Sequence, residues 1–345
     1  ILLSAVAHAA EEREFFNGVR SLGMGGVSVA VANDETALLA NPAALGKIRD
    51  FYGTVLDPEI DGGMNLNAMY TKKAFGELYN PKVVYKTLEK SPGKYYHNQG
   101  TLFPSLVVRN FGMGFYGRYL LDSELNAAGD DLRIDYIQDY AAVLGLNIRF
   151  WDGRIKIGAS GKVINRAEIA KNVNPTTDDL TVKANAAEGV GIGTDVGLIL
   201  TAPWHWLPTL SVVARDMGGT KFTQKGLLMN TAERPADIEA DYDVGFAIFP
   251  IHGKNFRSTW AIEYKSVLKA AEEEDKAKHY HLGYELNVGD IIFFRAGMNQ
   301  RYYTVGAEFA SEHIQMQFAY YGEEIGTADA LEEDRRLVGK IAYRF

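Results

Sequence analysis

The sequence predicts an all-β protein: a transmembrane antiparallel β-barrel of about 14 strands with its N-terminal segment, a hatch, inside the lumen. Three observations lead to this prediction. Apolar and polar residues alternate from about residue 50 to the end of the chain. The connections between the alternating segments are short on one side and mostly long on the other. The 35 glycines, 19 tyrosines and 17 phenylalanines favour strands and tight turns over helices.

The composition excludes several classes of protein. The 345 residues carry a formal net charge of -8, so the chain lacks the basic face that binding to nucleic acid requires. The absence of cysteine excludes disulfides, thiolate nucleophiles and zinc–thiolate sites. No window of about 18 consecutive apolar residues occurs, which excludes a transmembrane helix. Strands must therefore make any membrane crossing.

The first ten residues, ILLSAVAHAA, are similar to the end of a secretory signal. A short apolar stretch precedes the A-x-A pattern Ala7-His8-Ala9, and the polar chain starts at Glu11. The alternative is a short apolar helix that belongs to the mature fold. We expect residues 1–10 to be the remnant of a signal, so that the protein leaves the cytoplasm.

Residues 11–49 precede the alternating region and are rich in small residues. Within them, RSLGMGGVSVAVANDETALLANPAAL has too many glycines for a helix and too many small residues for an ordinary core strand. A barrel of about 14 strands is too wide for its own side chains to fill. We therefore expect this segment to fold inside the lumen as the hatch. Its expected key residues are Gly23, Gly25 and Gly26 for close backbone approach, Leu38 and Leu39, and the turn Asn41, Pro42 and Ala43.

From residue 50 to residue 345 the alternation predicts the barrel wall. In HYHLGYELNV, Tyr280, Leu282 and Tyr284 share one face, and His281 and Glu285 share the other. We place strands at about 50–70, 101–109, 111–121, 131–150, 154–169, 189–202, 208–217, 241–250, 255–267, 278–288, 291–299, 302–310, 313–322 and 336–345. A soluble β-sandwich also alternates, but its loops need not sort by side. An even number of strands places both chain ends on the short-turn, periplasmic side.

The ends of the strands carry features of bacterial outer-membrane barrels. Aromatic residues such as Trp204 and Trp206 stand near strand ends, where membrane–water interfaces favour them. The final strand, GKIAYRF, places Ile341, Tyr343 and Phe345 on one face. A last strand that ends in phenylalanine is similar to the assembly signal of these barrels. We therefore expect a location in the bacterial outer membrane, contact with its lipid, and recognition of Phe345 by the barrel-assembly machinery.

Residues 18–46, including the triplet Asn41-Pro42-Ala43, resemble the hatch of the FadL family of hydrophobic-compound transporters and of the related PorV-like barrels. Over the rest of the chain the resemblance is architectural. It implies a fourteen-stranded barrel whose hatch lies under a hydrophobic pocket and whose third strand opens the wall toward lipid. The implied function is passive uptake of a small hydrophobic compound without a cofactor.

The second and third predicted strands contain candidates for such a lateral gate. The third strand reads FGMGFYGRYLL, and its interior glycines Gly112, Gly114 and Gly117 are typical of a bulge or a bend. Pro104 in the preceding strand removes a ladder hydrogen bond. The alternative is that Gly112 and Gly114 only make room for the hatch. Unbroken pairing between the second, third and fourth strands would count against a gate.

A second function stays open because polar residues are expected in the lumen. The alternation points Arg118, Glu263, Lys265, His279, His281 and Glu285 inward. PorV-like relatives are scaffold barrels that dock other proteins through their outer loops. The longest loop contains Leu78, Val83, Val84, Tyr85 and Leu88, which predict a short amphipathic helix that caps the pore. A scaffold should have a lumen sealed by charges, and a transporter an apolar pocket above the hatch. Association into homo-oligomers is also left open.

The sequence predicts no enzyme and no metal centre. His279, His281 and Glu285 share a face and could form a two-His–one-carboxylate set, but alternating polar residues are expected on any lumen face. The motifs G-x-S-x-G and H-E-x-x-H and an EF-hand loop do not occur. The stretch GMGGVS has Ser28 where a dinucleotide-binding loop needs its third glycine.

Overall fold

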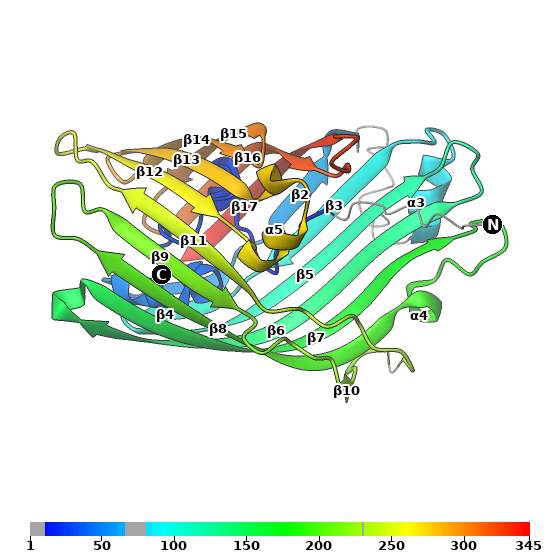
Figure 1. Cartoon of the computed structure of the whole chain (residues 1–345), viewed down its shortest axis with the longest axis horizontal. Helices are drawn as coiled ribbons and strands as arrows, with labels where there is room; N and C mark the ends of the chain where they lie inside the picture. Colours follow the sequence, from blue (N-terminus) through cyan, green and yellow to red (C-terminus); the bar gives the residue numbers. More distant parts are fainter. Residues whose placement is uncertain (1–10, 66–80, 230) are drawn as a thin grey trace.

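The computed structural model describes residues 11–65, 81–229 and 231–345, which form a closed antiparallel β-barrel (Figure 1). Residues 1–10, where we expect a signal remnant, lie outside the described residues. Fourteen strands build the described wall, as predicted. Two of them are split: β1 (Tyr52–Leu56) and β2 (Glu59–Gly63) form the first strand, and β3 (Tyr95–Leu102) and β4 (Ser105–Val108) form the second.

The remaining strands follow one another around the barrel. They are β5 (Phe111–Leu125), β6 (Leu132–Phe150), β7 (Ile155–Val173), β8 (Ala187–Thr201), β9 (Thr209–Arg215), β11 (Asp241–Ile248), β12 (Phe256–Tyr264), β13 (Tyr280–Val288), β14 (Ile292–Asn299), β15 (Tyr302–Ala310), β16 (Ile314–Glu324) and β17 (Glu333–Arg344). β17 closes the ring by pairing with β1 and β2, for example Gly339 with Ile60. A two-residue strand, β10 (Gln224–Lys225), pairs with β8.

The two faces of the wall differ in the way the alternation predicts. On β12 and β13, Trp260, Ile262 and Leu282 are 53%, 44% and 39% exposed, whereas His281 and Glu285 on the opposite face are buried. A closed barrel satisfies its backbone hydrogen bonds internally, and an exposed apolar outer face is stable in hydrocarbon. The chain is therefore a membrane-spanning barrel of the bacterial outer-membrane type.

The helices are short. They are α1 (Val19–Gly23), α2 (Ala37–Ala40), α3 (Pro81–Leu88), α4 (Val182–Asn185) and α5 (Val267–Glu272), with 3-10 turns η1 (Pro42–Lys47), η3 (Trp151–Gly153) and η4 (Lys276–His279). In the described ranges, no helix has the length and apolar character needed to cross a bilayer.

Helix α3 does not cap the pore, contrary to the prediction. Val84 and Leu88 pack against Tyr96 and Leu121. Leu121 lies opposite Tyr136, on the face of β6 that also carries the exposed Tyr140, so α3 covers the outer face of the wall. Leu78 lies outside the described residues.

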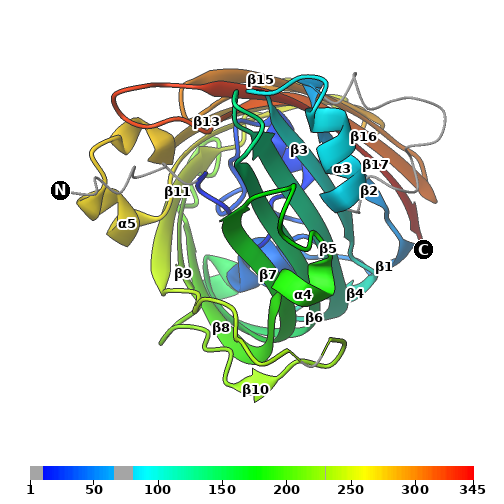
Figure 2. The same ribbon diagram turned by 90° about the vertical axis from the view of Figure 1, so that its right-hand side faces the viewer.

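The N-terminal segment, residues 11–49, lies inside the barrel and is drawn in blue in Figures 1 and 2. Helix α1 packs on β14, β15 and β16, while η1 packs on β6, β7 and β8. The side chains of Met24, Leu38 and Leu45 are completely buried. The segment thus bridges opposite sides of the wall.

Candidate functional site

Glycines bring the N-terminal segment into direct contact with the backbone of the wall. Gly25 and Gly26 have positive φ angles of 70° and 87°. The Gly25 amide donates a hydrogen bond to Thr304 Oγ1 at 2.9 Å. A Cβ atom at Gly25 would lie 2.2 Å from the carbonyl oxygen of Leu282, and one at Gly23 would lie 3.1 Å from Gly306 Cα. The segment therefore has no room for side chains where it meets β13, β14 and β15.

Asn41 joins three parts of the interior. Its Oδ1 accepts a hydrogen bond from the Ala43 amide at 2.9 Å, and its Nδ2 donates to the Val29 carbonyl at 2.8 Å and to Ser211 Oγ at 2.7 Å. Pro42 starts η1, where its missing N–H costs no hydrogen bond. Leu38, Leu39 and Ala43 belong to the apolar cluster around η1. The NPA turn thus fastens the segment to itself and to β9.

Replacing Asn41 by alanine should loosen the segment. The change leaves the Val29 carbonyl, the Ala43 amide and Ser211 without this partner in a buried site, which should cost about 3 kcal/mol of folding free energy. The expected result is a lower melting midpoint, measured by the heat-dependent loss of the compact electrophoretic form. Asn255→Ala, at an exposed asparagine, is the matched control and should leave the midpoint unchanged.

The polar residues predicted for the lumen lie on the inner face, where five of the six bind the N-terminal segment. Glu263 accepts hydrogen bonds from the Ser28 amide at 2.9 Å and the Ala30 amide at 3.1 Å. Glu285 pairs with Arg20 at 2.8 Å and with Arg295 at 2.7 Å. The Nδ1–H of His281 donates to the Gly25 carbonyl at 2.9 Å.

Two of the other three predicted lumen residues bind Glu14 of the segment. Lys265 pairs with the Glu14 carboxylate at 2.7 Å, and Arg118 donates to the Glu14 carbonyl at 2.8 Å and pairs with Asp139 at 2.6 Å. His279 Nε2 lies 3.1 Å from a carboxylate oxygen of Glu273. Because His279, His281 and Glu285 have different partners, they do not form a shared metal site.

Residues 11–14, which the sequence did not single out, carry four charges that pair with residues of β5, β17 and the loop after β12. Glu11 pairs with Arg336 of β17 at 2.7 Å, Glu12 with Lys269 of α5 at 3.0 Å, Arg13 with Asp122 of β5 at 2.7 Å, and Glu14 with Lys265. We call these eight residues the charged seal. Burial would raise the pKa of Glu11, but the charge and hydrogen bonds of Arg336 outweigh burial and hold it well below its ordinary value.

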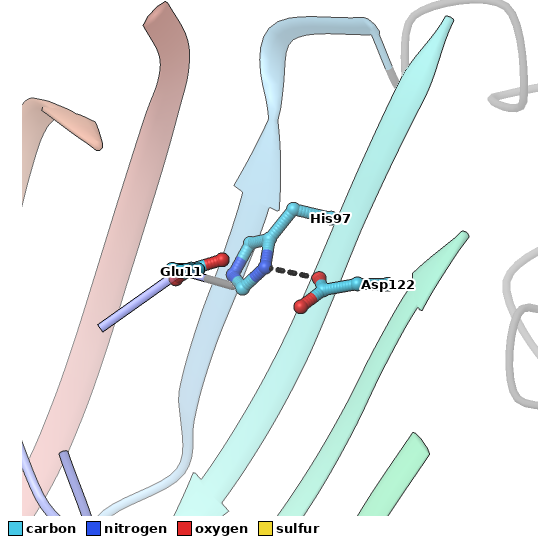
Figure 3. Close-up of side chains that lie close together, drawn as sticks. All are labelled: Glu11, His97 and Asp122. Carbon is cyan, nitrogen blue, oxygen red and sulfur yellow. Dashed lines mark hydrogen bonds and ion pairs between the residues drawn. The ribbon is translucent and has the colours of Figure 1, made fainter. Parts of the chain in front are cut away.

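Glu11, His97 and Asp122 converge within the charged seal (Figure 3). His97 Nδ1 lies 2.6 Å from Asp122 Oδ1. Both oxygens of Glu11 accept hydrogen bonds from Arg336, and Asp122 Oδ2 accepts one from Arg13. Two guanidinium groups therefore already compensate the two carboxylates, and the arrangement is an ion-pair network rather than a cation site.

The space above the N-terminal segment differs from the apolar pocket that we expected. The cavity there has a volume of about 60 Å³ and is lined mainly by polar and charged side chains, including Glu11, Arg13, Lys265 and Arg336. The inward positions of the strands carry these charges, and residues 11–14 pair with them. Within the described residues, the cavity in this part of the lumen is small and mainly polar.

The four candidate gate residues have different surroundings. Pairing between β5 and β6 is continuous from Phe111–Leu146 to Leu125–Leu132, so the third strand has no bulge on that side. The second strand is split at Phe103-Pro104, but its register with β5 is the same on both sides of the split, and the Phe115 amide donates to the Pro104 carbonyl at 3.0 Å. The pairing between the second and third strands therefore keeps its register and counts against a bulge there.

The three candidate glycines of β5 also have different neighbours. A Cβ at Gly112 would meet Leu45 and Leu38 at 3.2 and 3.3 Å, so Gly112 makes room for the N-terminal segment. A Cβ at Gly117 would make only ordinary contacts, with the Tyr140 ring at 3.8 Å and the Leu102 carbonyl oxygen at 3.9 Å. A Cβ at Gly114 would lie 2.8 Å from the ring of Phe103.

The split in the second strand separates two apolar regions. Inside the barrel, Phe103 lies in an aromatic cluster with Phe16 and Tyr116, at ring-centroid distances of 6.0 and 6.2 Å, and Phe15 lies 5.1 Å from Tyr116. Outside, a depression of about 620 Å³ is lined by Pro104, Ser105, Leu106, Met113, Gly114, Ala142, Val143, Leu144, Gly161, Lys162, Val163 and Ile192. Ser105 and Gly114 face inward, so the depression reaches into the wall at this point.

Comparison with known proteins shows the fold. No family model and no curated protein matches the sequence. Among solved structures, the CymD monoaromatic hydrocarbon channel has a TM-score of 0.55 at 12% identity and covers 94% of this chain and 96% of its own. The Pseudomonas putida toluene transporter TodX has a TM-score of 0.54 at 12% identity and covers 95% of this chain and 97% of its own. A Pseudomonas aeruginosa FadL homologue has a TM-score of 0.50 at 10% identity and covers 95% of this chain and 97% of its own. The chain therefore shares the barrel fold of the FadL-type channels.

Proposed function

We propose that the protein is an outer-membrane barrel for the passive uptake of a small hydrophobic compound, which leaves sideways through the wall at the split between β3 and β4. The observation that carries this proposal is the meeting of two apolar regions at Phe103-Pro104. Monoaromatic hydrocarbons are the substrate class of the similar channels, and they are the first class to test here.

A lateral exit follows the apolar side chains of the chain. An apolar solute that crossed the polar lumen would lose about 25 cal/mol of burial free energy for each Å² of its surface left in contact with polar surroundings. The aromatic cluster of Phe15, Phe16, Phe103 and Tyr116 instead adjoins the split, and the depression on the other side faces lipid. The ring of Phe103 occupies the space beside Gly114, so this ring is the proposed gate.

In this proposal residues 11–49 act as the hatch, and the charged seal blocks the route into the lumen from outside the cell. Residues 11–14 and Phe15 line the same small cavity, and in this proposal residues 11–14 move when a solute enters it. Lys162 and Arg118 lie 4.9 and 5.8 Å from the centre of the Phe15 ring and hold it in place.

Two variants of the gate should change uptake in opposite directions. Gly114→Val presses side-chain atoms against the Phe103 ring, which would lie 2.8 Å from the added Cβ, so the ring loses room to swing aside. Entry of the hydrophobic fluorophore N-phenyl-1-naphthylamine into cells should slow by at least about tenfold, the effect of about 1.4 kcal/mol on a barrier. Phe103→Ala removes the gate and should speed entry, although it costs about 3–5 kcal/mol of stability.

Gly253→Val is the matched control for Gly114→Val, because a Cβ at Gly253 meets nothing within 4 Å. Each variant is compared at equal amounts of folded barrel in the membrane. Equal uptake by the wild type, Gly114→Val and Phe103→Ala would refute the lateral gate.

The second candidate is a PorV-like scaffold that conducts nothing and docks other proteins through its outer loops. The small cavity and the ion pairs that cross the lumen are the observations that favour it. The two candidates separate in one experiment. Purified barrel that carries no co-purified hydrophobic ligand, and that does not bind the fluorophore, would support the scaffold.

A further inference from the structure

The loop between β9 and β11 touches both faces of the wall: Phe222 packs into the apolar cluster of the N-terminal segment, whereas residues 227–229 bind side chains on the outer face of β7 and β8. It comprises residues 217–229 and 231–238, which we call the β10 hairpin. Its start bonds to β8 through the Met217 amide and the Thr194 carbonyl at 2.7 Å, and Thr220 bridges to Ile238. Figures 1 and 2 show β10 standing outside the ring of strands.

The hairpin covers two polar side chains of the outer wall. The Leu227 amide donates to Asn165 Oδ1 at 2.9 Å, and the Leu228 and Met229 amides donate to the Glu188 carboxylate at 2.9 and 2.6 Å. Asn165 Nδ2 also donates to Glu188 at 3.0 Å. Asn165 and Glu188 are buried as a result.

Asn165 and Glu188 belong to the outer face. On β7, Asn165 lies two residues beyond Val163, which is 48% exposed, and on β8, Glu188 lies four residues from Ile192, which is 70% exposed. Pairing between β7 and β8 is continuous through these positions, so the residues that point outward at Val163 and Ile192 continue to do so at Asn165 and Glu188. Without the hairpin, an amide and a carboxylate would stand directly above the apolar belt.

The hairpin presents leucines in place of these polar groups. The side chains of Leu227 and Leu228 are 77% and 59% exposed, although their backbone amides are bound to the wall.

We propose that the β10 hairpin is a lipid-binding element: Leu227 and Leu228 enter the acyl chains of the outer leaflet and extend the apolar belt over Asn165 and Glu188. Continuity with the belt at Val163 and Ile192 selects lipid as the occupant. The hairpin leaves the barrel on the side of the long connections, which is the outer side of the membrane. This surface is independent of the proposed gate.

The absence of cysteine in the chain allows a direct test. A nitroxide on Leu227→Cys, in barrel reconstituted into phosphatidylcholine nanodiscs, reports its accessibility to oxygen, which concentrates in hydrocarbon, and to a water-soluble nickel complex. The oxygen-to-nickel ratio should match that of Leu144→Cys on the lipid-facing belt. It should exceed, several-fold, the ratio of Ala128→Cys in the exposed loop between β5 and β6.

The same label on Leu228→Cys should give the same result, and both substitutions preserve the amides that dock the hairpin. A ratio at Leu227 and Leu228 equal to that of Ala128→Cys would overturn the proposal. Uptake of the hydrophobic fluorophore by Leu227→Asp should equal that of the wild type, which separates the lipid contact from the proposed transport function.

Discussion

Replacing Arg336 by methionine should open the lumen to ions. Arg336 is buried and holds both oxygens of Glu11 at 2.7 and 2.9 Å and Asp334 at 2.7 Å. Removing one partner of a buried ion pair leaves uncompensated charge and costs about 3–5 kcal/mol. The least costly response is for residues 11–14 to leave the wall and take up water. We expect stepwise conductance across a planar bilayer, where the wild type remains closed.

Arg257→Met is the matched control, because Arg257 is an exposed arginine that pairs with Asp290 at 3.5 Å. Exposed pairs contribute about 0–1 kcal/mol, so this variant should stay closed. The lowered pKa of Glu11 adds a pH test. Its contribution is present above the ordinary carboxyl pKa and is lost only as the pH falls through the lowered value, so the wild type should remain closed at about pH 3.5, where an ordinary glutamate is mostly protonated. A closed Arg336→Met barrel would show that the seal does not depend on this pair.

The barrel wall could be predicted from the sequence because its determinant is local. An outward residue such as Trp260 or Leu282 must be apolar, and its neighbour need not be, so each strand carries its own period of two. The start of the second strand was predicted at about residue 101 and is observed at Tyr95. There the outer face is covered by α3, so the membrane no longer imposes the alternation.

The charged seal could not be predicted in the same way. Glu11 and Arg336 are 325 positions apart, and Arg13 and Asp122 are 109 apart. The stretch Glu11-Glu12-Arg13-Glu14 has the composition of any solvated terminus, and only the closed ring brings β5, β12 and β17 around it. Inward charges such as Lys265 and Glu285 were visible in the sequence, but their partners were not.

The seating of the N-terminal segment should fail most severely when Gly25 is replaced by alanine. The added Cβ would lie 2.2 Å from the Leu282 carbonyl oxygen and 2.6 Å from the Met298 amide nitrogen. Both atoms belong to the wall backbone, which cannot move aside without breaking the pairing of β13 and β14. The segment itself must therefore shift, and residues 18–49 should become open to protease in the folded barrel.

A second glycine separates this clash from the cost of the backbone conformation. Gly129 has a φ of 79°, but a Cβ there meets nothing within 4 Å. Gly129→Ala should therefore cost only the about 1–2 kcal/mol of free energy that a non-glycine residue requires in the left-handed conformation. The N-terminal segment should stay protected from protease. If Gly25→Ala were as resistant to protease as Gly129→Ala, the close approach of segment and wall would not be what seats the segment. A segment released by Gly25→Ala alone would show that the fit between two backbones, rather than apolar burial, determines where it lies.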